Sequence, residues 1–344
     1  MTKDENPIVR MPNQTRRSTV GDWNGILPTE PRVTRLQRIQ QGVWRTEQLR
    51  WPAGKPQKDQ RVRARYPTLP NWLAETRDGV PLESDGLNIM SEEARCYTRD
   101  RLPVLAEIDG KAEPDRLWRN LLSSQPMAFS IAGHLHAHRS AAAALMAAMT
   151  GLPVGGLGRL EVHTQDLAAY LLDGIEAEWF PPRSEHTGDM SGCDMAACLE
   201  LKDGRRVLAT VEVKYIDTFS PKPVTWDRYQ EHLTALGLDA ATTTDLVKAG
   251  CSQVLRQVMI TDSVRRRGLA PGAGESGHVD QAVAVVLARE DDATARRVAE
   301  TLDQSVGPVV PVQFWSHRQL LDQAATLVDL SDWAHAMAVR YLGD

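Results

Sequence analysis

The chain has 344 residues and a formal net charge of -5; 42% of its residues are hydrophobic and 25% are charged. These values are typical of a globular protein and exclude a disordered chain. No stretch approaches the roughly 18 apolar residues that a membrane helix needs, and the first residues lack the apolar core of a signal peptide. We therefore expect a cytoplasmic protein that does not enter a membrane. The mild acidity also argues against a protein that coats nucleic acid over its whole surface.

The chain contains four cysteines. Because no two of them form a CxxC pair, the sequence indicates neither a structural zinc site nor a disulfide scaffold. We expect these cysteines to be reduced and mostly buried. They are Cys96, Cys193, Cys198 and Cys251.

Composition divides the chain into three stretches. Residues 1–31 are polar and rich in proline, without sustained periodicity, which predicts an irregular arm. Residues 32–150 are expected to be mainly helical and to begin with a helix over residues 33–49, because apolar residues recur there at helical spacing. Residues 151–344 carry a predicted α/β domain.

The first helix belongs to a basic segment, residues 32–65, in which only Glu47 and Asp59 are acidic. This excess of positive charge either faces phosphate groups or forms a solvated helix that pairs with acids elsewhere in the fold. The sequence leaves both interpretations open. Between Arg32 and Arg65 the basic residues are Arg35, Arg38, Arg45, Arg50, Lys55, Lys58, Arg61 and Arg63.

Helical patterns continue through the rest of the first half. We predict a helix over residues 91–101, another over 114–122, and a third that follows the segment 124–130 and ends near residue 150. The glycine-rich break at 151–158 does not follow a strand with GxGxxG spacing, which argues against a phosphate-binding loop. A short helix is expected over 165–172.

Strands dominate the next part of the chain. They are predicted over residues 175–180, 193–201 and 206–216, with a hairpin signal at Lys202-Asp203-Gly204. Helices follow over 226–236 and 244–265, then a loop over 268–277. The last section is expected to contain strands over 281–287 and 310–315 and helices over 294–304, 318–328 and 331–342. This alternation predicts an α/β fold with a mixed central β-sheet flanked by helices.

Apolar alternation sets the register of the hairpin. Four apolar residues on each strand must share the buried face, which requires an odd number of residues in the turn. A three-residue turn with Gly204 in the left-handed conformation meets this condition. Asp194 then faces Glu212, and Lys214 lies two residues further along the same side. The apolar residues are Met195, Ala197, Leu199 and Leu201 on the first strand and Val207, Ala209, Val211 and Val213 on the second.

Asp194, Glu212 and Lys214 suit the hydrolysis of a phosphodiester. Two carboxylates held opposite each other repel unless a cation neutralises them. Carboxylate oxygens suit Mg²⁺ or Mn²⁺, which lowers the pKa of a bound water and polarises the phosphorus centre. Lys214 can orient or help deprotonate that water and offset negative charge in the transition state.

A solvated hairpin face would also carry Asp, Glu and Lys, so these residue types alone do not decide the function. Two observations favour a site. The carboxylates fall in register, and Glu212 and Lys214 lie between valines in an apolar strand, where an unpaired charge is costly.

The segment Cys193-Asp194-Met195, followed by Val211-Glu212-Val213-Lys214-Tyr215, resembles motifs II and III of the PD-(D/E)xK nuclease superfamily. Cys193 stands where the family has the proline that names the motif, and this departure does not touch a metal ligand. The resemblance implies a restriction-endonuclease-like core, a metal-dependent nuclease activity, and Asp194 and Glu212 as the metal ligands.

A narrower resemblance, to a bacterial group of restriction-endonuclease-like proteins, covers most of the chain from about Val33. It rests on Ser124-Gln125-Pro126-Met127-Ala128-Phe129, on the segment from Trp44 to Gly54, and on Glu178 before Asp194. In the superfamily a further upstream acid often assists the metal. Glu178, and with less support Glu176, matches that acid in order.

The resemblance extends to the helix after the hairpin, which carries Gln253, Arg256 and Gln257. It is similar to the helix whose Gln or Arg positions substrate or catalytic groups in such nucleases. We therefore expect Gln253 and Arg256 to position the substrate. For Arg256, a phosphate contact and a surface ion pair stay equally open.

Other motifs have weaker support. His134, His136 and His138 form an HxHxH run, but the alanines that follow favour the start of a helix, where this spacing separates the side chains. His186 precedes Asp194 in a loop and is expected to be ordinary polar surface. No GxSxG motif indicates a serine hydrolase. The tryptophans mostly sit on apolar stripes and are expected in the core.

We therefore expect a Mg²⁺-dependent endonuclease acting on DNA, in restriction or defence. Its catalytic residues would be Asp194, Glu212 and Lys214, with Glu178 as an auxiliary acid. The rival hypothesis is a nuclease-like fold that binds nucleic acid or a protein partner without catalysis. The sequence leaves DNA against RNA, the mode of cutting, protein partners and homo-oligomer formation open.

Overall fold

The computed structural model describes residues 30–55, 68–82, 86–161, 165–220, 225–271 and 274–344. The predicted irregular arm, residues 1–31, lies outside these ranges except for its last two residues. Among the described helices, none is both long enough and apolar enough to cross a bilayer.

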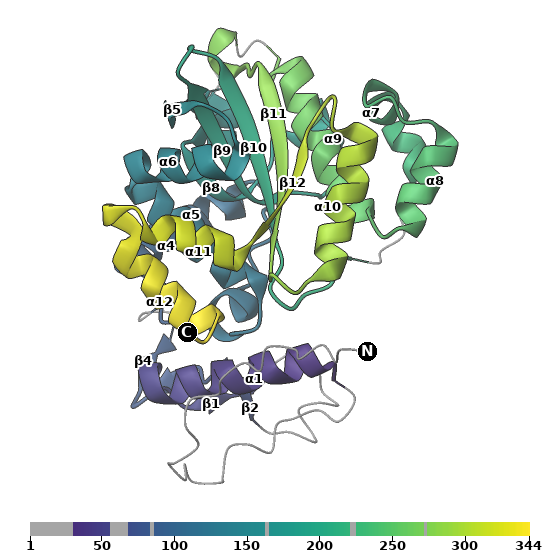
Figure 1. Cartoon of the computed structure of the whole chain (residues 1–344). Coiled ribbons are helices and arrows are strands. Elements are labelled where there is room, and N and C mark those ends of the chain that lie inside the picture. Colours follow the sequence, from purple (N-terminus) through teal and green to yellow (C-terminus); the bar gives the residue numbers. More distant parts are fainter. Residues whose placement is uncertain (1–29, 56–67, 83–85, 162–164, 221–224, 272–273) are drawn as a thin grey trace.

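A mixed sheet of six strands forms the centre of the molecule (Figure 1). Its order is β12-β11-β10-β9-β5, and β8 also pairs with β9. β9 runs antiparallel to β5, β8 and β10, whereas β10, β11 and β12 are mutually parallel. The predicted mixed α/β fold is therefore confirmed. The strands are β5 (Val154–Leu157), β8 (Ile175–Trp179), β9 (Cys193–Leu201), β10 (Arg206–Val213), β11 (Gln281–Ala288) and β12 (Val312–Ser316).

The hairpin of β9 and β10 has the predicted register. Paired residues run from Arg206 opposite Glu200 to Val211 opposite Met195, so one further step places Glu212 opposite Asp194. The backbone N–H of Leu201 donates to the carbonyl of Arg205 at 2.8 Å. The turn closes through Gly204, whose φ of 86° is in the left-handed region.

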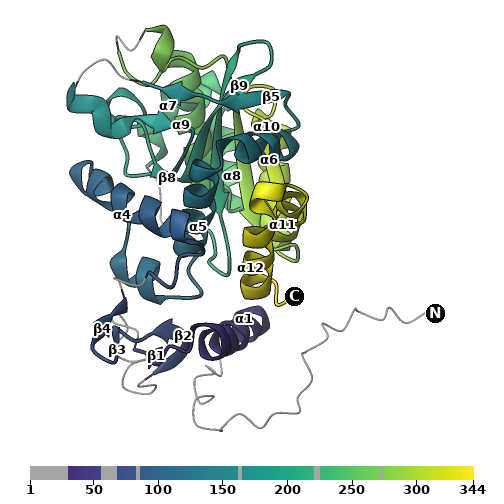
Figure 2. The same ribbon diagram turned by 90° about the vertical axis from the view of Figure 1, so that its left-hand side faces the viewer.

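Helices cover both faces of the sheet (Figures 1 and 2). One face packs against α5 and α6, with α4, α11 and α12 around them, and the other packs against α9 and α10, with α7 and α8 further out. The first group comprises α4 (Glu92–Glu107), α5 (Ser124–Ala137), α6 (Arg139–Thr150), α11 (His317–Ala325) and α12 (Ser331–Tyr341). The second comprises α7 (Gln230–Ala235), α8 (Ala240–Lys248), α9 (Ser252–Arg267) and α10 (Ala293–Val306).

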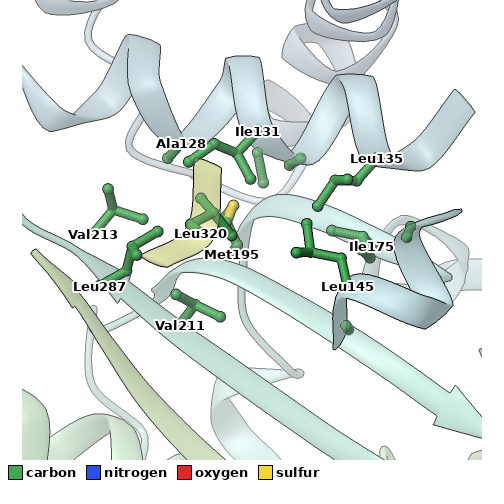
Figure 3. Packing of buried hydrophobic residues seen from close by; sticks show 14 of the residues in the cluster. Ala128, Ile131, Leu135, Leu145, Ile175, Met195, Val211, Val213, Leu287 and Leu320 are labelled. Carbon is green, nitrogen blue, oxygen red and sulfur yellow. The ribbon is translucent and has the colours of Figure 1, made fainter. Parts of the chain in front are cut away.

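The apolar residues that set the register all lie in the core on the α5 side. Figure 3 shows Met195, Val211 and Val213 packed beneath Ile131 and Leu135 of α5. The alternate positions Ala196, Cys198 and Leu208 pack in a separate cluster that includes Val264 of α9. Both faces of the hairpin are thus buried, and the side chains of Asp194 and Glu212 belong to the α9 side.

The N-terminal region packs beside the C-terminal helix (Figures 1 and 2). Helix α1 (Arg32–Trp44) continues into a π-helical turn (Arg45–Leu49), and β1 (Ala53–Gly54) pairs with β2 (Leu69–Leu73). The side chains of Gln40 and Gln41 both donate to the carbonyl of Arg340, each at 2.9 Å. Two further pairs of short strands are antiparallel: β3 (Thr76–Arg77) with β4 (Val80–Pro81), and β6 (Arg159–Leu160) with β7 (Leu172–Asp173).

Several predicted elements differ from those observed in the first half of the chain. The helix expected over 114–122 is only a π-helical turn (Asp115–Arg119). The segment 124–130 is itself helical, because the side chain of Ser123 accepts a hydrogen bond from the backbone of Gln125 and so caps α5. The glycine-rich break contains β5, and the helix expected over 165–172 is a 3-10 helix (Gln165–Tyr170).

In the second half, one predicted helix is two. The region 244–265 belongs to α8 and α9, which are separated at Gly250, a residue with a φ of 84° that an α-helix cannot contain. Buried residues of α5 and α6 pack in the same core cluster as the sheet.

Cysteines and tryptophans lie largely where the sequence predicts. All four cysteines are free, and Cys96 alone among them is exposed. The buried tryptophans include Trp44, Trp51, Trp118, Trp179 and Trp333.

The loop between β8 and β9 is anchored by His186, which is buried rather than on the surface as predicted. Its Nδ1 lies 2.9 Å from the Ser263 hydroxyl of α9, and its Nε2 lies 3.0 Å from the Leu269 carbonyl. Burial lowers the pKa of His186 to about 4. The imidazole is therefore neutral in the folded protein near pH 7.

Replacing Gly204 with Ala should lower the free energy of unfolding by about 1 kcal/mol, because a residue with a Cβ is strained at this φ. A Cβ there meets no atom within 4 Å, so no clash adds to the cost. Gly204→Asn should lose less, since Asn tolerates the left-handed region. Urea unfolding measures both variants, and equal losses would contradict a purely conformational cause.

Acid should destabilise the fold through His186. Its folded pKa of about 4 lies below the unfolded value of 6.5, so its contribution is present above pH 6.5 and is lost as the pH falls toward 4. The largest effect is roughly 3 kcal/mol. His186→Asn, which does not titrate, should flatten this part of the stability profile in urea unfolding between pH 7 and pH 4. An unchanged slope would argue against the burial of a neutral imidazole.

Candidate functional site

Three acidic side chains come from three neighbouring strands. Glu178 lies on β8, Asp194 at the start of β9, and Glu212 near the end of β10. β8 pairs with β9 at Ala177 and at Trp179, on either side of Glu178. Glu178 has a φ of 48°, which is costly for a residue with a side chain. Such strained residues concentrate at functional sites.

Glu212 is the most enclosed of the three acids, with 2% of its surface exposed. Its Oε1 lies 2.6 Å from the Nζ of Lys214 and accepts a hydrogen bond from Gln253 at 2.5 Å. Its Oε2 accepts a hydrogen bond from Gln257. The buried charge of Glu212 is therefore satisfied by one cation and two amides.

Lys214 follows the last residue of β10, and its backbone N–H still donates to Leu287 of β11 at 2.8 Å. The strand predicted over 206–216 thus ends at Val213, but its pairing holds Lys214 in place. Burial lowers the pKa of Lys214, yet the charges of Glu212 and Asp194 outweigh this and raise it above the usual value. The ammonium is protonated at neutral pH and supplies positive charge rather than a base.

Asp194 is held by the hairpin itself. Its Oδ2 accepts a hydrogen bond from the backbone of Val213 at 2.7 Å. Burial, together with the charges of Glu212 and Glu178, raises the pKa of Asp194 well above its usual value. Burial is also the main reason why the pKa of Glu178 rises to about 7, and Glu212 adds to the effect. The site therefore concentrates negative charge that a cation would relieve.

Helix α9 contributes Gln253 and Gln257 to the site. These residues are four apart and so lie on one face of the helix. Arg256 points elsewhere: its Nη1 lies 3.8 Å from Asp189 in the β8–β9 loop, and its Nε donates to the carbonyl of Ser252 at 3.3 Å. Gln253 thus reaches the site, where it binds Glu212, and Gln257 binds the other oxygen of the same carboxylate. Arg256 instead forms an ion pair with Asp189. The four-residue spacing was the signal that favours Gln257.

Gln125 contacts one of the three acids, a contact that no sequence pattern predicted. It lies in the first turn of α5 and is 4% exposed. Its Nε2 donates to Glu178 at 2.8 Å and to the carbonyl of Lys111 at 3.0 Å. Gln125 belongs to the segment Ser124 to Phe129, on which the narrower family resemblance rests. Neither helical nor strand periodicity predicts its contact with Glu178, which is 53 positions away in the sequence.

Glu176, the weaker alternative for the upstream acid, faces a different environment. It accepts a hydrogen bond from the hydroxyl of Tyr97 at 2.7 Å and lies 3.6 Å from the Nε of Arg101. These three residues line a cavity of about 780 Å³ against α4 and α5. The residues that line it do not include Asp194 or Glu212. Glu178 is therefore the acid that matches in space as well as in order.

The HxHxH residues lie at the end of α5 rather than at the start of a helix. The alanines that follow them belong to α6, a separate helix, which explains the error. His134 stacks on Trp333 with ring centroids 4.8 Å apart, and the Nδ1 of His136 lies 3.1 Å from the Ile175 carbonyl. These contacts give both side chains structural roles.

Within the described ranges, no three His, Cys, Asp or Glu side chains converge as a ready set of metal ligands. Neither the HxHxH histidines nor the set of Glu178, Asp194 and Glu212 forms such a group. Mg²⁺ does not need such a set, since it is usually held by one or two carboxylates with waters and substrate phosphates completing its shell. Asp194 and Glu212 fit that smaller requirement.

Two arginines of the basic segment are used inside the fold. Arg38 forms an ion pair with Glu30 and a hydrogen bond with Asn71. Arg45 is buried and donates to the carbonyl of Trp51 at 2.6 Å. Arg38 and Arg45 therefore bind groups of the protein itself and do not face phosphate. Lys58, Arg61 and Arg63 lie outside the described residues.

Comparison with known proteins agrees with this geometry. A family model described as the PD-(D/E)XK nuclease superfamily matches residues 28–343. Comparisons with curated proteins and with solved structures gave no match. The match spans the sheet, the hairpin and the helices on both of its faces, and it confirms the resemblance seen in the motifs. The chain belongs to the PD-(D/E)XK nuclease superfamily.

Proposed function

We propose that this protein is a metal-dependent endonuclease that hydrolyses phosphodiester bonds of DNA in the cytoplasm. The observation that carries the proposal is the pairing of a buried Glu212 with Lys214 beside Asp194, which lies opposite Glu212 in the hairpin register. Membership of the superfamily supports nuclease activity in general. The chemistry of the side chains supports the reaction.

The donor set fits Mg²⁺ or Mn²⁺. All the candidate ligands are carboxylate oxygens, which such hard cations prefer. Asp194 and Glu212 would hold the ion, and Glu178 is the auxiliary acid at the same end of the sheet. When bound, the metal supplies an activated water and a Lewis acid at the phosphorus centre.

The residues around the acids have separate tasks in this proposal. Lys214 offsets the negative charge that develops on the phosphoryl oxygens. Gln253 and Gln257 fix the carboxylate of Glu212 from α9. Gln253 also accepts a hydrogen bond from the backbone of Ser220 at 2.9 Å, which joins α9 to the segment that follows Lys214. Arg256 holds the loop before β9 through Asp189 and does not need to touch the substrate.

DNA as the substrate and a role in restriction or defence extend the proposal further. Support comes from the resemblance to restriction-endonuclease-like proteins, which is an analogy at the level of the fold. The charge of Arg116 lowers the pKa of Glu178, so a cationic side chain lies near enough to act on this acid, and Arg116 also pairs with Asp217 at 3.8 Å. A nuclease-like subunit without activity would bind DNA but show no Mg²⁺-dependent turnover.

Lys214→Ala should reduce cleavage of supercoiled plasmid by about 100-fold to 1,000-fold, the usual effect of removing a group that stabilises transition-state charge. Lys202→Ala is the matched control, because Lys202 is exposed in the turn of the same hairpin. Circular dichroism checks that both variants fold. Cleavage by Lys214→Ala at the wild-type rate would exclude the assigned role.

Asp194→Asn should abolish Mg²⁺-dependent cleavage and, in EDTA at neutral pH, increase the free energy of unfolding by about 1 kcal/mol, because it replaces a carboxyl whose ionisation is opposed by burial and by the charges of Glu212 and Glu178. The exposed Asp203→Asn in the turn is the control. Thermal unfolding and plasmid cleavage measure the two effects. A variant that loses stability in EDTA would contradict the repulsion.

The substrate is tested with single-stranded circles, supercoiled plasmid, methylated plasmid and RNA, each with and without Mg²⁺. We expect cutting of the circular DNA, which has no ends, and discrimination between modified and unmodified DNA. Cutting of RNA alone would exclude DNA as the substrate. DNA binding without turnover under every condition would favour the inactive subunit.

A further inference from the structure

We propose that Gln125 is a positioning residue that fixes the carboxylate of Glu178 in the metal site. The inference rests on the proposed function and deepens it. Gln125 comes from α5, on the opposite side of the sheet from Gln253 and Gln257, so the acids would be oriented by amides from two helices.

The backbone around Gln125 determines how its amide points. Its Oε1 accepts a hydrogen bond from the N–H of Glu113 at 3.1 Å, so the amide oxygen must face that group. The NH₂ group then donates to the carbonyl of Lys111 at 3.0 Å and to Glu178 at 2.8 Å. A flipped amide would place its donors against the N–H of Glu113. One donor is therefore always directed at Glu178.

The start of α5 is itself held in place. The Ser123 side chain accepts a hydrogen bond from the backbone of Gln125 at 3.2 Å. The backbone of Ser124 donates to Asp217 at 3.0 Å, and Asp217 lies three residues after Lys214. Gln125 thus stands on a helix end that is tied to the same strand end as Lys214.

Glu178 needs such a support. Its positive φ, which is strained for a residue with a side chain, turns it out of the regular alternation of β8, and neighbouring contacts must offset that strain. In the described part of the chain, the side chain of Gln125 donates a hydrogen bond to the carboxylate of Glu178. Lys111, whose carbonyl binds Gln125, donates from its Nζ to the Met190 carbonyl at 2.6 Å and so ties the segment to the β8–β9 loop.

A binding experiment tests this inference without relying on cleavage. Mn²⁺ alone is titrated into the full chain by calorimetry, for wild type, Gln125→Met, Glu178→Gln and the double variant. Gln125→Met should weaken Mn²⁺ binding by about 10-fold to 100-fold, the usual effect of removing a partner of a metal ligand. In the Glu178→Gln background the same change should alter binding by no more than about twofold.

Ser130→Ala is the matched control on α5. It removes the hydroxyl that accepts a hydrogen bond from the backbone of Met90 at 2.9 Å and donates to the carbonyl of Pro126 at 2.6 Å, so both bonds that are lost involve backbone groups of other residues than the site acids. Mn²⁺ affinity should stay at the wild-type value in this variant. Thermal unfolding separates a loss of fold from a loss of binding.

The outcomes are distinct. Wild-type affinity in Gln125→Met would overturn the inference and leave the proposed function standing. Equal losses from Gln125→Met in both backgrounds would also overturn it, since they would show a general structural effect. A wild-type protein that binds no Mn²⁺ and cuts no DNA would overturn the proposed function and the inference together.

Discussion

The buried charge of Glu212 is the constraint on which the site depends. A carboxylate removed from water is unfavourable unless every oxygen has a partner. Here one strand supplies Lys214 and one helix supplies two glutamines. Asp194 and Glu178 stand nearby with raised pKa values, so positive charge from one lysine does not balance the acids. The fold keeps this excess of acidic groups because both faces of the hairpin are packed in the core, so moving an acid away from the others would disrupt that packing.

The hairpin was predictable because its rules are local. Alternating apolar residues and a three-residue turn determine the register, and both lie within about 20 consecutive residues. Asp194 and Glu212 could therefore be placed opposite each other before any tertiary contact was known. The helices at the end of the chain were also predictable, since their apolar periodicity is regular.

The other site residues depend on contacts that no local pattern encodes. Gln125 reaches Glu178 across 53 positions of the sequence, and Gln257 reaches Glu212 across 45. For Arg256 the sequence left a phosphate contact and a surface ion pair equally open, and the partner in the structure is Asp189 of a distant loop. Arg38 and Arg45 likewise appeared to be surface charges, and their acceptors come from separate segments.

The hydrogen bond between Gln41 and Arg340 spans 299 positions, and it sets an order of events during synthesis. The same Gln41 amide donates to the hydroxyl of Tyr215 at 3.0 Å, one residue beyond Lys214. Helix α1 is made before the hairpin, and its partner α12 is made after it. A chain emerging from the ribosome can pair β9 with β10 long before α1 docks. Tyr215, the residue beside Lys214, therefore gains the anchored form of this neighbour only after α12 has been made.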